Sequence, residues 1–250
     1  MVTVYWATYP EQSDQSISEL RYKKPESLLK DINPTEFFGH LAGRCPAIIN
    51  ECANTFKIKS PVDLHLTFND DFTSCNSKYK QELSFISQLI GEIGPERVVQ
   101  MSSPTYLFYC DEDLTMSQLP PYYEETDFAN GCIGVSATYN INKWFRPVKP
   151  TFKLKKNNNT IDIKMDDAIC YYKFNTDEKI KLVQFDAEVF NNNSILKNIL
   201  TYKFNTKHPF APSKLIDNYN AFVQARYNKK IIKIINDNFC LLYTSPSPRD

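Results

Sequence analysis

The sequence predicts an α+β fold dominated by an antiparallel β-sandwich or jelly-roll-like barrel, with a helical C-terminal appendage. Short segments of alternating apolar and polar side chains, separated by polar turns, follow one another between Ile133 and Phe185. Residues 62–68 alternate strictly, as a half-buried strand does. Apolar residues recur at helical spacing from Leu215 to Ile235, which predicts an amphipathic helix.

The segment 133–185 is predicted to be a contiguous antiparallel meander. Tight turns are expected at Asn157–Asn159, at Asp166-Asp167 and over residues 175–178, because Asn and Asp favour turn conformations. A first strand is expected over residues 133–141, and the proline-containing stretch 147–150 is expected at a corner where the chain changes sheet. The side chains expected to be buried in this meander are Phe152, Leu154, Ile161, Ile163 and Ile169.

The remaining elements follow from local patterns. Before the meander we expect strands over 2–9, 56–58, 62–68, 98–101 and 106–110, helical segments over 25–32, 45–52 and 79–93, and mostly loop over 111–130. In the helix that Cys45-Pro46 opens, Ile48, Ile49 and Cys52 form one apolar stripe. After the meander, a short helix over 195–202 precedes the amphipathic one.

These patterns divide the chain into three parts. Residues 1–190 are expected to form a β-rich domain with short helices, and residues 191–239 a helical C-terminal segment. Residues 240–250, CLLYTSPSPRD, can be read as the translation of a transposon-type sequencing adapter. We therefore expect this tail to be non-native and unpacked, and the helical segment to be truncated where it starts.

Composition limits the classes of partner. Lys and Arg together number 29, as do Asp and Glu, so no net basic charge attracts nucleic acid or a membrane surface. Apart from Cys240 there are six Cys, and none forms a C-x-x-C pair. With neither a signal peptide nor a long apolar run, a reduced cytoplasmic location is expected, the host cytoplasm if the protein is viral.

No catalytic, metal or cofactor site is assigned from the sequence. The three His residues form none of the common zinc or iron motifs, and phosphate-binding and nucleotide-binding glycine motifs are absent. His65 beside Asp63 can be a general base, but a solvated surface His is the preferred interpretation. Cys110 is interpreted as a buried thiol, and the carboxylates of residues 111–113, the best metal candidate, as a solvated turn.

Two aromatic groups are the candidate binding residues for a ligand or partner. Tyr122 and Tyr123 follow Pro120-Pro121 in a polar loop, where their rings can stack on a sugar or a protein. Trp144 and Arg146 are expected at the predicted sheet corner. The competing interpretation is that these rings pack into the fold. The lysines at 153, 155 and 156 are interpreted as protection of a strand edge against pairing.

The order of several motifs resembles uncharacterised proteins of marine tailed phages and some bacteria. The resemblance covers residues 45–185, and it implies a shared fold but no activity. The motifs that carry it are Cys45-Pro46, the segment FKIKSPVD from Phe56, the segment WFRP from Trp144, Phe152, and the strand from Asp166-Asp167-Ala168 to Phe174.

The sequence therefore predicts a phage-encoded accessory or binding protein that contacts a protein or a small ligand. Two alternatives stay open: an enzyme on a cupin-like barrel without the usual His metal set, and a structural component of the virion. Sandwich folds host all three classes, and the oligomeric state is open.

Overall fold

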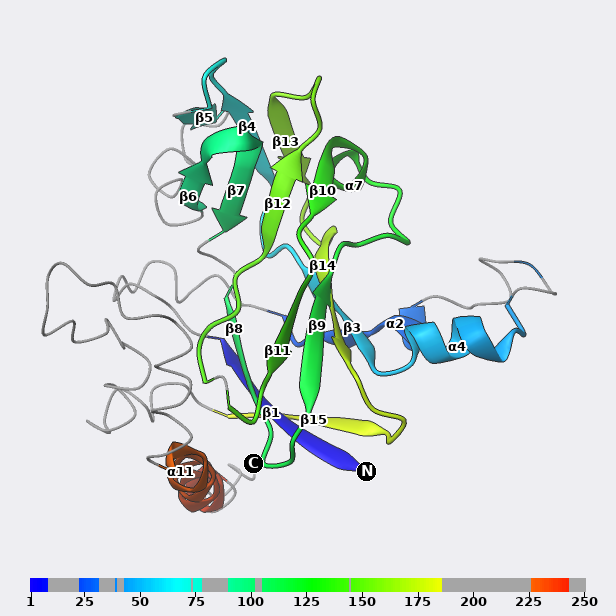
Figure 1. Ribbon diagram of the computed structural model, residues 1–250, viewed down its shortest axis with the longest axis vertical. Helices are drawn as coiled ribbons and strands as arrows, with labels where there is room; N and C mark the ends of the chain where they lie inside the picture. Colours follow the sequence, from blue (N-terminus) through cyan, green and yellow to red (C-terminus); the bar gives the residue numbers. More distant parts are fainter. Residues whose placement is uncertain are drawn as a thin grey trace, which may run out of the picture.

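The computed structural model describes residues 1–8, 23–31, 39, 43–72, 74–77, 90–101, 105–143, 145–185 and 226–242. In these ranges strands dominate, arranged in four sheets that are antiparallel except for one pair, and the helices are few (Figure 1). The β-rich α+β class is thus confirmed. No helix within these ranges combines the length and the apolar character that crossing a membrane requires.

The four sheets combine strands that are distant in sequence. The three-stranded sheet β15-β1-β8 contains Ile180–Gln184, Val2–Thr8 and Tyr106–Tyr109. The five-stranded sheet β11-β9-β14-β3-β2 contains Ala137–Asn140, Thr115–Leu119, Ala168–Phe174, Thr55–Lys59 and Glu26–Ser27. The four-stranded sheet β10-β12-β7-β6 contains Cys132–Gly134, Thr151–Leu154, Val98–Met101 and Ile90–Gly94. The sheet β13-β4-β5 contains Thr160–Ile163, Leu64–Phe68 and Cys75–Ser77.

Helices lie at the margins of these sheets. Figure 1 shows α2 and α4 beside the five-stranded sheet and α11 near its opposite end, beyond β1. The described helices are α2 (Leu28–Asp31), α4 (Pro46–Cys52), the 3-10 turn η1 (Pro95–Arg97), α7 (Asp127–Gly131) and α11 (Tyr227–Leu242). Thr126 caps α7 because its side chain accepts a hydrogen bond from the Ala129 N–H at 3.2 Å.

A single large apolar cluster contains residues from all four sheets. Successive side chains of a strand point to opposite faces of its sheet, and this places alternate residues in the cluster. Tyr172 and Phe174 of β14 point into the cluster, whereas Tyr171 points to the other face of the sheet. Phe108 of β8 meets Tyr172 edge to face at 5.0 Å between ring centroids. The five side chains that the sequence predicts as buried are confirmed: Phe152, Leu154, Ile161, Ile163 and Ile169.

The C-terminal helix α11 packs against the β-rich body. Ile231 and Ile235 of α11 are buried in a second cluster with Leu107 and Tyr109, which point away from the main core. The strand β8 is therefore buried on both of its faces. The helix backbone continues to Leu242 and so includes the first three residues of the predicted non-native, unpacked tail. The side chains of these three residues and the rest of the tail lie outside the described residues.

The predicted meander is wrong in its pairing. β12 pairs with β10 and β7, β13 pairs with β4, β14 lies between β3 and β9, and β15 runs parallel to β1. Asn54 provides a physical reason for the last departure. Its side-chain amide donates to the carbonyls of Thr176 and Glu178 at 2.9 and 2.8 Å, and its Oδ1 accepts from the Ile180 N–H at 3.2 Å. These bonds fix the segment between β14 and β15, so that the chain leaves the five-stranded sheet after β14 and β15 lies beside β1.

Other local expectations are also corrected. Ile90–Gly94 is a strand where a helix was expected, and the predicted helical residues before it lie outside the described residues. The expected loop over 111–130 contains β9 and α7. Residues 133–141 belong to two strands in different sheets, and the change falls next to Gly134, where a Cβ would meet the Cβ of Pro120 at 2.7 Å. β12 lies inside its sheet, so Lys153 does not protect an edge, and Lys155 and Lys156 follow the end of the strand.

The N-terminal helices and the cysteines differ in detail from expectation. The segment predicted as a helical turn over 25–32 starts with β2 and continues as α2. In α4, Cys52 is buried but Ile49 is 36% exposed, so the expected apolar stripe is incomplete. Cys45 is half-buried, and the six cysteines that precede residue 240 are free thiols.

Candidate functional site

The predicted tyrosine loop lies against the five-stranded sheet. Its turn is held by hydrogen bonds from the Tyr122 N–H to the Pro120 carbonyl at 2.9 Å and from the Glu124 N–H to the Pro121 carbonyl at 3.0 Å. Tyr122, Tyr123 and Tyr171 of β14 form a tyrosine cluster, with ring centroids 4.5 Å apart for Tyr122 and Tyr123 and 5.2 Å apart for Tyr122 and Tyr171. Tyr171 is fully buried, whereas Tyr122 is 42% exposed.

A largely buried ion pair fixes the loop to the sheet. The Lys57 Nζ of β3 lies 2.9 Å from the Glu124 Oε1, and the Tyr171 hydroxyl donates to the same oxygen at 2.9 Å. The Lys57 and Glu124 side chains are 9% and 19% exposed. A largely buried ion pair needs further hydrogen bonds to offset the desolvation of its two charges, and the Tyr171 hydroxyl provides one. The tyrosine cluster is thus held in place by charge as well as by ring packing.

Other lysines around this sheet are paired in the same way. Lys173 of β14 binds Glu51 of α4 at 2.6 Å, and the hydroxyl of Tyr122 donates to the other Glu51 oxygen at 3.4 Å. Lys59 of β3 binds Glu26 of β2 at 2.6 Å. The partners of Lys57 and Lys173 come from two different covering segments, the tyrosine loop and α4, whereas Glu26 lies in the neighbouring strand β2 of the same sheet.

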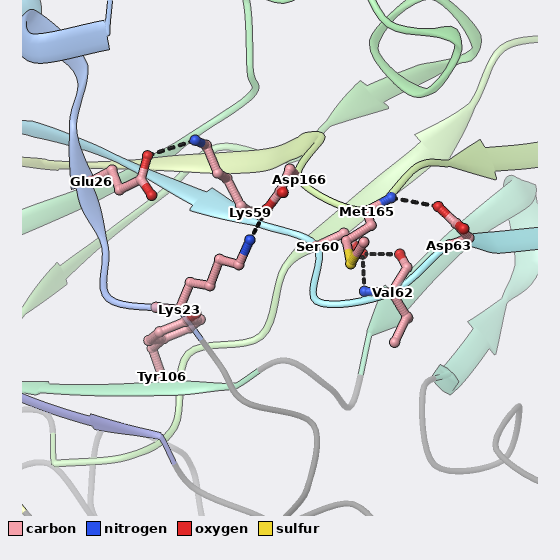
Figure 2. A network of polar contacts seen from close by, with 9 residues as sticks. All are labelled: Lys23, Glu26, Lys59, Ser60, Val62, Asp63, Tyr106, Met165 and Asp166. Atoms are coloured by element: carbon pink, nitrogen blue, oxygen red, sulfur yellow. Dashed lines mark hydrogen bonds and ion pairs between the residues drawn. The ribbon is translucent and has the colours of Figure 1, made fainter.

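Figure 2 shows how this polar layer continues to the turn between β13 and β14. The Lys23 ammonium contacts the Asp166 carboxylate, and the Lys23 carbonyl accepts a hydrogen bond from the Tyr106 hydroxyl at 2.9 Å. The Asp63 carboxylate accepts from the Met165 N–H at 2.7 Å. Lys23 therefore links the three-stranded sheet of β8 to this turn, and Asp63 has a structural role.

Burial suppresses ionisation in the tyrosine cluster. Desolvation raises the pKa of Tyr123 to about 12, and its contact with Cys52 adds to the shift. The pKa values of Tyr122 and Tyr171 are raised further, again mainly by desolvation. Desolvation also raises the pKa of the Cys52 thiol, more than its hydrogen bond with Tyr123 lowers it. Neutral phenols and a protonated thiol cannot act as a base or nucleophile near pH 7, so the cluster provides ring surface and hydroxyl groups.

The structure brings together only part of the predicted site. Tyr122 and Tyr123 are neighbours, as expected. Arg146 is half-buried in a separate segment between β11 and β12, and Trp144 lies outside the described residues. Sequence reasoning missed several residues around the tyrosines, although polar side chains at alternate positions of predicted strands were a signal for the lysines. The missed residues are Glu51, Lys57, Glu124, Tyr171 and Lys173.

The other candidates for chemistry have structural partners. His65 pairs with Asp162 of the neighbouring strand, Nδ1 to Oδ2 at 3.1 Å, instead of with Asp63. Asp113 accepts from Asn140 at 2.5 Å and contacts Lys143 at 3.3 Å, and these two partners lower its pKa. Within the part of the chain that the structure describes, no three His, Cys, Asp or Glu side chains converge as metal ligands would.

Comparison with known proteins identifies no relative. No family model, no curated protein and no solved structure matches the chain. The functional argument therefore depends on the geometry of the tyrosine cluster and its surroundings.

Proposed function

We propose that this chain is a non-catalytic binding protein that contacts a protein or a small ligand through Tyr122. The observation that carries the proposal is the 42% exposure of Tyr122, whose ring is backed by Tyr123 of the same loop and by Tyr171 of β14. Exposed aromatic rings are frequent anchors in interfaces because they bury a large area with few rotamers to order. An accessory protein of a phage, working in the host cytoplasm, is the setting that agrees with the sequence.

The loop is prepared for association. Its turn is hydrogen-bonded, and Glu124 is fixed by Lys57 and Tyr171. A loop that is already ordered loses less conformational entropy on binding, and this increases affinity. Arg146 and Trp144, for which the sequence predicts a sheet corner, are proposed as further contact residues. A sandwich-like packing of the four sheets, which their shared apolar cluster supports, would give this loop a rigid base.

Site-specific photo-crosslinking tests the proposal. Tyr122 is replaced by benzoylphenylalanine, and the protein is irradiated in a bacterial host lysate. The matched control carries the same group at Met165, an exposed apolar position at the turn between β13 and β14. We expect a discrete adduct from position 122 that unlabelled wild-type protein competes away and that Met165 does not give. Equal adducts at both positions, or none at position 122, would contradict the proposal.

A second candidate function is hydrolysis, favoured by the His65–Asp162 pair. A carboxylate 3.1 Å from Nδ1 can orient an imidazole as a general base, and the His65 side chain is 26% exposed. Screening wild-type protein and His65→Gln against generic ester and phosphoester substrates tests this function. An activity that wild-type protein has and the variant lacks would put hydrolysis ahead of binding. Self-assembly into large particles on a sizing column would instead favour the virion component.

A further inference from the structure

Two β-branched side chains are exposed together at the end of β10, the edge strand of the four-stranded sheet: Ile133 lies in the strand and Val135 directly follows it. Ile133 is 54% exposed and Val135 is 40% exposed. The bond from the Val135 N–H to the Thr151 carbonyl continues the pairing of β10 with β12, so both side chains point outward, opposite to the buried Cys132. We call this pair the β10 strip. Contiguous exposed apolar side chains at a sheet edge are typical of interaction surfaces and are otherwise a risk for aggregation.

The backbone under the β10 strip is fixed. The Val135 N–H donates to the Thr151 carbonyl at 2.8 Å, and its carbonyl accepts from the Gln118 side chain at 3.3 Å. Gly134, between the two exposed residues, lies so close to Pro120 that a Cβ there would approach the proline Cβ to 2.7 Å. The strip therefore presents its two side chains in a set geometry.

Basic side chains border the β10 strip. Ile133 is directly opposite Lys153 of β12, and Lys155, two residues further along, is exposed on the same outward face. The Lys155 ammonium donates to the Asn130 carbonyl at 2.6 Å, beside the start of the strip. Between positions 143 and 161 the chain has six basic residues and no acidic one: Lys143, Arg146, Lys149, Lys153, Lys155 and Lys156.

The anionic partner that Lys153 has here is held weakly. Glu96 lies 3.3 Å from the Lys153 Nζ, and the two side chains are 81% and 43% exposed. Exposed pairs of this kind contribute little, so an incoming carboxylate can replace Glu96 at small cost. The strip and its border thus combine aliphatic surface with available positive charge.

We propose that the β10 strip is a second docking surface, whose partner is an acidic protein segment with aliphatic side chains. The aliphatic groups cover Ile133 and Val135, and the carboxylates approach Lys153 and Lys155. The positive charge of the lysines favours a negatively charged partner. The aliphatic side chains of the β10 strip favour a protein segment that also has aliphatic side chains. Single-stranded nucleic acid would also meet the positive charge, but its bases stack on aromatic rings, and the strip provides β-branched aliphatic groups instead.

A displayed random-peptide library tests the docking surface. The library is selected against wild-type protein and counter-selected against an Ile133→Ser/Val135→Ser variant, and the enriched peptides are measured by fluorescence anisotropy. We expect sequences rich in Asp, Glu and aliphatic residues. Their Kd should rise about tenfold or more in the serine variant and in a Lys153→Gln/Lys155→Gln variant. Met165→Ser, a change at an exposed apolar residue elsewhere, should leave the Kd within about twofold.

Three results would overturn the inference. One is enrichment of basic or uncharged peptides, or of none. Another is an unchanged Kd in the serine variant. The third is displacement of the peptides by a short oligothymidylate, which would assign the lysines to nucleic acid. Because Tyr122 is intact in every variant, failure here leaves the proposal for the tyrosine cluster standing.

Discussion

Replacing Glu124 by Gln removes the charge that faces Lys57 in the ion pair under the tyrosine loop. The two side chains are 19% and 9% exposed and their charged atoms lie 2.9 Å apart. Leaving one charge of a buried pair without its counter-charge costs about 3–5 kcal/mol, and the partial exposure of Glu124 places the expected loss at about 3 kcal/mol. For a chain of this length, that loss lowers Tm by roughly 6–12 °C.

A double-mutant cycle isolates the pair from other effects of each substitution. Lys57→Met removes the cation but keeps most of the aliphatic stem, so it should cost about 2 kcal/mol. The variant with both changes has no buried charge at this position and should be about as stable as Lys57→Met alone. The coupling free energy expected from urea unfolding is then about 2–3 kcal/mol.

The exposed pair Lys153–Glu96 provides the matched control. Its charged atoms lie 3.3 Å apart, and its side chains are 43% and 81% exposed. Lys153→Met and Glu96→Gln should couple by about 0.2–1 kcal/mol, since water screens both charges. If the Lys57–Glu124 coupling were no larger than this, the argument that a dry ion pair fixes the tyrosine loop would be refuted.

Three further predictions concern stability, each measured by urea unfolding. Asn54→Ala should lower the unfolding free energy by about 2–4 kcal/mol, because it removes three side-chain hydrogen bonds and places alanine at a φ of 54°. Asn54→Gly loses the same hydrogen bonds but should cost less, because glycine adopts this φ freely. Equal losses in the two variants would contradict a backbone contribution. Ile163→Ala should cost about 2–5 kcal/mol, since the side chain is 1% exposed in the main core; a loss under about 1 kcal/mol would contradict that packing. Burial raises the pKa of Cys132 and of Cys170 to about 12 from an ordinary 9.0. Above pH 9 these thiols therefore ionise in the unfolded chain first, and the unfolding free energy falls by up to about 1.4 kcal/mol per pH unit for each thiol. Cys132→Ala should remove the part of this slope that Cys132 contributes, and stability that stays level from about pH 8 to 11 would contradict the burial argument.

Local patterns in the sequence predicted strands better than they predicted partners. The alternation over β4 is visible in the residues themselves, and the burial expected for Phe152 and Ile163 is confirmed. Pairing depends on contacts that alternation does not encode. β15 follows β14 closely in sequence, yet it joins β1 at the other end of the chain, a result to which Asn54 contributes through its bonds to the connecting segment.

The helix expected over 79–93 shows a different limit. Apolar residues at 90 and 93 fit a helical stripe, and the same residues lie in β6, which pairs with β7. Glycine commonly ends helices, but the glycines at 91 and 94 are both strand residues here. Short apolar segments satisfy both periodicities, so only the neighbouring strand decides between them.

The tyrosine loop was found from its composition, and its role depends on residues that composition does not connect to it. A period-two row of lysines normally indicates a solvated sheet face, and Lys57, Lys59 and Lys173 would be so interpreted. In the structure Lys57 and Lys173 are covered, because their glutamate partners come from the tyrosine loop and from α4, whereas Lys59 pairs with Glu26 of the edge strand β2 in the same sheet. The apolar cluster on this side of the sheet is small, so ion pairs replace part of the hydrophobic contact that usually attaches such a layer. Tyr122 thereby lies at the surface on a hydrogen-bonded loop instead of in the core, and an exposed ring on an ordered loop is what the proposed binding function requires.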